Sequence, residues 1–77
     1  MFVEFRHIVK DACKEKNLTY AQIATLAGIE ESTVKSFMCG ANDSRRVAER
    51  LADVLGIKLI YSNGTYTVAE TENVVNQ

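Results

Sequence analysis

Residues 19–56 read TYAQIATLAGIEESTVKSFMCGANDSRRVAERLADVLG and contain three successive helical patterns. The first begins with Thr19 and has Gln22 three residues later, which is the capping-box pattern of a helix start. We expect this helix to end at Gly28, because glycine readily takes the positive φ of a sharp turn. A short helix, a glycine turn and a second short helix predict a helix-turn-helix.

The second helical pattern covers residues 31–39 and places Val34 and Phe37, with the methionine that follows, on its buried side. Residues 40–44 form a turn cluster of small and polar residues. The last two residues of that cluster are both good helix caps, and the third helix then runs to Gly56.

Upstream of this core, apolar residues recur at helical spacing and predict an amphipathic first helix that ends near Asn17. Asparagine tolerates the left-handed conformation that often ends a helix. The apolar positions of this helix are Phe2, Phe5, Ile8, Val9, Ala12 and Cys13.

Downstream of Gly56 the apolar period changes from helical spacing to two. Asn63-Gly64 lies between runs of strand-forming residues, which is a strong signal for a β-hairpin with a two-residue turn. This turn predicts that Ser62 pairs with Thr65, Tyr61 with Tyr66, Ile60 with Thr67, and Leu59 with Val68. Leu59, Tyr61, Tyr66 and Val68 would then share one face of the hairpin.

The segment 19–56 resembles the Cro/phage-repressor (XRE-type) helix-turn-helix family, and the first helix resembles it loosely. The matching positions are Ala21-Gln22-Ile23-Ala24, Ala27-Gly28-Ile29, Ser32-Thr33-Val34, Gly40, Asn42, Ser44, Leu51-Ala52 and Leu55-Gly56. The resemblance implies a mainly α, five-helix DNA-binding domain, here over residues 1–57. We expect the C-terminal β-hairpin at 58–69 and a flexible polar tail at 70–77 to follow it.

The resemblance also implies a function. Members of this family are sequence-specific regulators of transcription that bind double-stranded DNA, often repressors from phages, plasmids or mobile elements. The third helix reads base edges in the major groove, which here corresponds to Glu31, Ser32, Lys35 and Ser36. The positions that match phosphate contacts are Thr19, Tyr20, Gln22, Thr33, Asn42, Ser44, Arg45 and Arg46; of these, Thr33 could instead touch a thymine methyl group.

Two glutamates depart from the family pattern. Glu30 lies where the family usually has a serine or threonine cap, and Glu31 where glutamine or arginine is common. Carboxylates beside DNA phosphates weaken binding, although Glu31 could accept a hydrogen bond from a cytosine amine. Glu30 could equally serve only to complement the helix dipole.

The hairpin has three possible roles. It could pack on its own helices, act as a wing that touches DNA, or form a homodimer through Leu59, Tyr61, Tyr66 and Val68. We favour the dimer, because an isolated hairpin is marginal in water and helix-turn-helix regulators usually bind two half-sites as two-fold dimers.

Length, charge and the absence of targeting signals limit the domain count and the expected location of the protein. The chain has 77 residues, enough for one domain, and a net charge of −1. Residues 33–50 hold four basic and two acidic side chains, a local net charge of +2. We expect a cytoplasmic protein, because the sequence shows no signal peptide and no membrane span.

Catalysis is not expected, because the chain has no nucleotide-binding loop, metalloprotease motif or serine-nucleophile motif. We expect no metal, no cofactor and no small-molecule ligand domain. His7 fits a surface role, and Cys13 and Cys39 fit core or near-core positions. The rival hypothesis is a protein–protein module, such as an antirepressor or an antitoxin-like subunit, which the net negative charge and the two glutamates favour.

Overall fold

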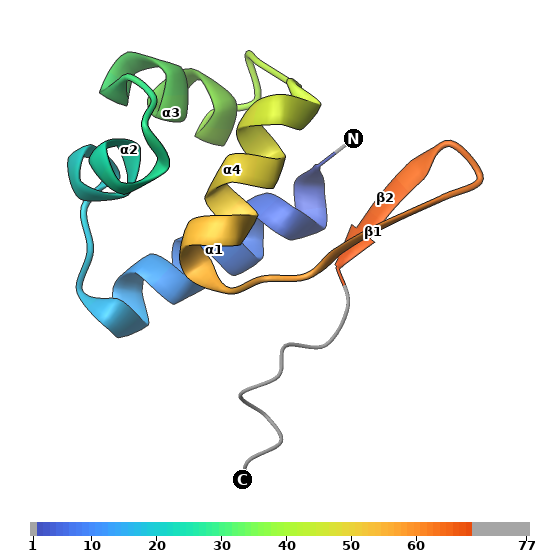
Figure 1. Cartoon of the computed structure of the whole chain (residues 1–77), viewed down its shortest axis with the longest axis horizontal. Coiled ribbons are helices and arrows are strands. Elements are labelled where there is room, and N and C mark those ends of the chain that lie inside the picture. Colours follow the sequence, from blue (N-terminus) through green and yellow to red (C-terminus); the bar gives the residue numbers. More distant parts are fainter. Residues whose placement is uncertain (1, 69–77) are drawn as a thin grey trace, which may run out of the picture.

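The structure is a computed structural model that describes residues 2–68, so the predicted tail at 70–77 lies outside the described residues. Helices α1 to α4 form a bundle, and a two-stranded antiparallel sheet extends beyond it on the side of α4 away from α2 (Figure 1). The elements are α1 (Val3–Lys16), α2 (Tyr20–Ala27), α3 (Glu31–Met38), α4 (Arg45–Leu55), β1 (Leu59–Ser62) and β2 (Thr65–Val68).

The fifth helix implied by the family resemblance is not found: residues 2–68 contain four helices. The predicted hairpin follows α4 directly. Its strands are rich in aromatic and β-branched residues, and the turn at Asn63-Gly64 favours strand pairing over another helical turn. The mainly α fold with a C-terminal hairpin is otherwise as the sequence predicts.

The helix ends follow the predicted local chemistry. The Thr19 hydroxyl accepts a hydrogen bond from the Gln22 amide at 3.1 Å, and the Gln22 side chain accepts one from the Thr19 amide at 2.8 Å. This reciprocal pair is the predicted capping box. Asn17 ends α1 with a φ of 58°, and Gly28 ends α2 with a φ of 72°. Both residues are left-handed, which lets the chain turn sharply between helices.

Aromatic rings from the start of α1, from α3 and from β2 meet in the core. Phe2, Phe5 and Phe37 are almost fully buried, and their ring centroids lie 5.5–6.0 Å from one another. Tyr66 of β2 extends this cluster, because its ring centroid is 5.4 Å from that of Phe2. The predicted buried residue Val34 also lies in this core, with no exposed surface.

The strand register is the predicted one. Leu59 pairs with Val68, Ile60 with Thr67, Tyr61 with Tyr66 and Ser62 with Thr65. Asn63 and Gly64 have φ values of 53° and 76°, as a two-residue turn with two left-handed positions requires.

Candidate nucleic-acid interface

The outward face of α3 carries the residues predicted to read bases. Glu31, Ser32 and Lys35 are exposed and Ser36 is half-buried. Positions four residues apart lie on the same side of a helix, so these four side chains form one polar strip. Val34 and Phe37 lie on the other side and are fully buried, which holds the strip toward solvent.

Glu31 and Lys35 contact each other within this strip. The Lys35 ammonium lies 3.2 Å from the Glu31 carboxylate, and the two side chains are 63% and 47% exposed. A pair this exposed contributes little to stability, about 0–1 kcal/mol, because water screens it and both side chains lose freedom. The lysine can therefore exchange the glutamate for a base edge at small cost.

A surface cleft of about 390 Å³ lies between the α2–α3 turn, α3 and the start of α4. It brings together four of the residues predicted to contact phosphate, one on α3 and three on the stretch from the following turn to the start of α4: Thr33, Asn42, Ser44 and Arg46. Arg50 and Glu30 also line the cleft, so its lining includes two arginines and one glutamate.

Local hydrogen bonds shape the turn on one wall of this cleft. The Asn42 side-chain oxygen accepts a hydrogen bond from the Ser44 amide at 2.8 Å. The Ser44 hydroxyl caps α4 by accepting one from the Val47 amide at 3.3 Å. Asp43 and Ser44 are the two possible caps of this helix, and Ser44 is the residue that caps it. The Ser44 hydroxyl can still donate its proton to an acceptor in the cleft.

The remaining predicted phosphate contacts lie outside the cleft. Thr19 and Gln22 are exposed and Tyr20 is half-buried at the N-terminal end of α2. The first amides of a helix have no carbonyl partner within it, so this end favours a negative group. Arg45 is exposed in the first turn of α4.

Two arginines make contacts that the helical patterns do not indicate. Arg50 of α4 donates a hydrogen bond to the Ala27 carbonyl oxygen at 3.1 Å and so ties α4 to the end of α2. Arg6 of α1 forms an ion pair with Asp43 at 2.6 Å. Neither contact could be read from periodicity, because the partners are more than 20 residues apart.

The Arg6 pair sets the charge of the turn. The hydrogen bond from its guanidinium lowers the pKa of Asp43 below the ordinary value, so this carboxyl stays ionised and paired near neutral pH. Glu30, by contrast, lines the cleft itself.

The hairpin face predicted to dimerise contacts the chain's own helices over most of its length. Leu59, Tyr66 and Val68 are half-buried against the core, and the Tyr66 hydroxyl donates a hydrogen bond to Glu49 at 3.1 Å. Tyr61 is 57% exposed, and its ring centroid lies 4.9 Å from that of Tyr66. Packing on its own helices is therefore observed, and dimerisation stays a prediction that rests mainly on Tyr61.

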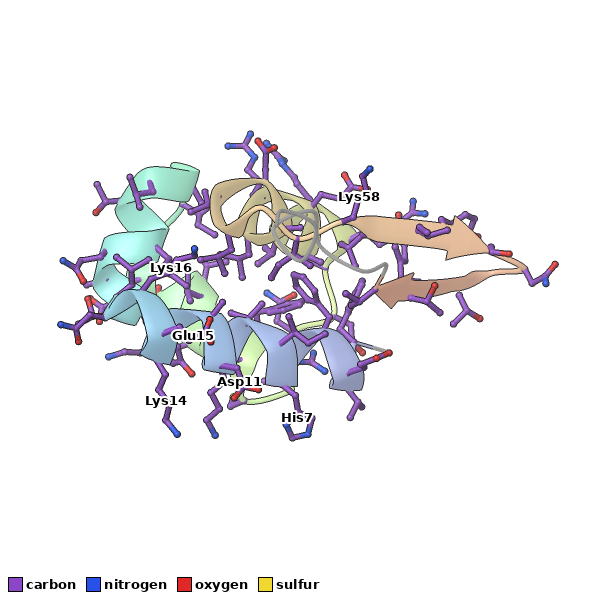
Figure 2. All side chains as sticks on the ribbon, turned by 90° about the horizontal axis from the view of Figure 1, so that it is seen from below. His7, Asp11, Lys14, Glu15, Lys16 and Lys58 are labelled. Carbon is purple, nitrogen blue, oxygen red and sulfur yellow. The ribbon has the colours of Figure 1, made fainter. Side chains whose placement is uncertain are left out.

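Among the described residues, the two cysteines and the histidine are separated from the cleft. Cys13 is buried, and burial raises the pKa of its thiol. Cys39 is exposed at the end of α3, so the prediction of a near-core position is wrong for it. His7 projects from the outer side of α1 (Figure 2). Within residues 2–68, no cluster of histidine, cysteine, aspartate or glutamate could hold a metal ion, and no helix is long and apolar enough to cross a membrane.

Comparison of the chain with protein-family models, with curated proteins and with solved structures finds no significant match.

Proposed function

We propose that this chain is a sequence-specific double-stranded DNA-binding protein, a regulator of transcription and a repressor of the XRE type. In this proposal α3 enters the major groove. Glu31, Ser32, Lys35 and Ser36 contact base edges. The cleft beside α3 and the N-terminal end of α2 hold the flanking phosphates. It is a binding role rather than a catalytic one, exerted in the cytoplasm.

One observation carries the proposal. Thr33 of α3 lines one cleft together with Asn42, Ser44 and Arg46, which follow in the turn and at the start of α4, and the exposed polar strip belongs to the same helix as Thr33. A phosphate backbone needs hydroxyl, amide and guanidinium donors next to the element that reads the groove. Arg50 adds a second guanidinium to this cleft.

Acidic side chains at the same face favour a second candidate, a protein–protein module. Glu30 lines the cleft, Glu31 lies on the outward face of α3, and the whole chain carries a net charge of −1. Under this alternative the same strip and cleft would bind a basic protein surface, as an antirepressor or antitoxin-like subunit would.

Selection from a random duplex pool at near-physiological salt separates the two candidates. We expect an enriched palindrome with half-sites about one helical turn, roughly 10 base pairs, apart, because a two-fold dimer would place two α3 helices in successive major grooves. A single enriched half-site would keep DNA recognition and remove the dimer. Absence of both enrichment and salt-sensitive duplex binding would favour the protein–protein module.

Two variants then test which residues read bases and which contact phosphates. Lys35→Ala should relax the preference at one base position by about 1–3 kcal/mol. Arg46→Ala should weaken binding to all sequences alike and lower the salt slope by about one unit. Fluorescence anisotropy with the enriched duplex and its single-base variants measures both effects. If both variants bind every duplex as the parent does, the assignment of these residues is wrong.

A further inference from the structure

Arg6 connects α1 to the turn that precedes α4. Its Nε donates to the Phe37 carbonyl oxygen, and its Nη2 donates to the Asn42 carbonyl oxygen at 3.0 Å and to the Asp43 carboxylate at 2.6 Å. The guanidinium carbon also lies 4.7 Å from the centre of the Phe37 ring. The Arg6 side chain is only 14% exposed, and its contacts with the two carbonyl oxygens are partly buried, whereas its contact with Asp43 is exposed.

The three acceptors lie at the two ends of one short segment. Phe37 is in the last turn of α3, and its carbonyl oxygen also accepts a hydrogen bond from the Gly40 backbone N–H at 3.1 Å. Asn42 and Asp43 lie in the turn that forms one wall of the cleft. A planar guanidinium can serve all three acceptors at once, because its donors are arranged in a rigid fork. Arg6 therefore fixes the turn relative to α3.

The same contact removes a charge conflict. Asp43 lies between Asn42 and Ser44, two of the proposed phosphate contacts, and its side chain is 54% exposed. An unpaired carboxylate there would repel a phosphate in the cleft. The Arg6 guanidinium neutralises it from the side of α1.

We propose that Arg6 is a positioning residue for DNA binding, although we do not expect it to touch DNA. Through the Asn42 carbonyl and the Asp43 carboxylate it holds the turn in the shape that presents Asn42 and Ser44 to a phosphate. This inference rests on the proposed function, because it needs a phosphate in the cleft.

The test compares Arg6→Met with Lys14→Met. Both variants remove one positive charge from α1, but Lys14 projects from the outer side of the helix, away from the other elements (Figure 2). The affinity for a labelled 20-base-pair random duplex is measured between about 0.02 and 0.1 M salt, where the Debye length is on the order of 10–20 Å. Circular dichroism establishes that each variant is folded at the chosen temperature.

We expect Arg6→Met to bind about tenfold more weakly at 0.1 M salt and to lose about one unit of salt slope, since each phosphate contributes about 0.9 to that slope. Lys14→Met should stay within about twofold of the parent, because salt screens a distant charge. A merely structural role of Arg6 would lower the melting temperature and leave the salt slope of the folded protein unchanged, and that result would overturn the inference.

Arg6→Lys keeps the test decisive if Arg6→Met does not fold. Lysine keeps the charge but offers one nitrogen in place of the fork, so it cannot serve the three acceptors together. We expect an intermediate loss of affinity, and parent-like binding by a folded Arg6→Lys would overturn the inference. A parent chain that itself binds no duplex would instead refute the proposed function, so the two failures are distinguishable.

Discussion

Arg6 of α1 and Arg50 of α4 both donate hydrogen bonds to backbone carbonyl oxygens of other elements. A long side chain can run across its own helix and place its charged head on a neighbour. In a chain this small, such contacts hold short helices that few apolar residues can anchor. Arg50 lines the cleft, and Arg6 contacts Asn42, which also lines it, so single side chains link the stability of the domain to the shape of the proposed interface.

The free energy of unfolding of Asp43→Asn should depend less on pH than that of the parent. The folded-state pKa of Asp43 is lowered, mainly by the hydrogen bond from Arg6, so ionisation of Asp43 stabilises the fold. This contribution is fully present above the unfolded-state pKa, about 3.9, and is lost as the pH falls through the lower folded-state pKa.

Urea denaturation at pH 7, 5 and 3 measures this effect. The difference in midpoint between the parent and Asp43→Asn should be largest at pH 7 and 5 and should shrink at pH 3. Asp11→Asn removes a carboxylate from the outer side of α1 and serves as the matched charge control (Figure 2). A parent-to-variant difference that stays constant over this range would show that the ionised pair with Arg6 contributes nothing.

At the scale of elements, local signals placed the helix and strand ends well. The Thr19–Gln22 capping box, the left-handed Asn17 and the Asn63-Gly64 turn were all predicted and are all observed. Each involves residues at most three apart, so its energetics depend little on the rest of the fold. The fifth helix rests on the family resemblance alone, whereas the apolar patterns of residues 1–57 predict four helices, as observed.

Phe2→Ala should be the most damaging of the simple truncations near the N-terminus. Phe2 is 1% exposed, and its ring contacts those of Phe5, Phe37 and Tyr66, so it joins α1, α3 and β2. Truncating a buried aromatic residue costs about 3–5 kcal/mol, a large share of the roughly 4–12 kcal/mol expected for a domain of this length.

The neighbouring Val3 supplies the control for this truncation. It is 64% exposed, so Val3→Ala should change the free energy of unfolding by no more than about 0.5 kcal/mol. Chemical denaturation followed by circular dichroism compares the two variants. Equal midpoints would mean that the aromatic cluster does not hold the hairpin to the helices.

At the scale of the whole molecule, the hairpin is the element that bears on the proposed homodimer. Its inner residues already pack on the helices, and its outer end leaves Ile60 47% and Tyr61 57% exposed. Exposed strand edges and aromatic side chains are features through which two subunits can pair. We therefore retain the homodimer as part of the proposal, with Tyr61 as the residue that decides it.

Tyr61→Asp should lower the mass measured by light scattering from that of a dimer to that of a monomer, because a buried unpaired carboxylate opposes association. Ser62→Asp is the matched control, since Ser62 is the next residue along β1 and projects from the opposite face. A mass that Tyr61→Asp leaves unchanged would remove the hairpin from the dimer hypothesis.

The sequence by itself determined the four observed helices, the turn residues, the strand register and the polar strip of α3, because periodicity, capping and turn chemistry act between residues close in the chain. Only the tertiary structure decided that Thr33, Asn42, Ser44 and Arg46 line one cleft, that Arg6 reaches Asp43, and that Tyr66 joins the phenylalanine cluster. These contacts join segments brought together by burial of the apolar core, and a local pattern carries no information about which distant partner a side chain will meet.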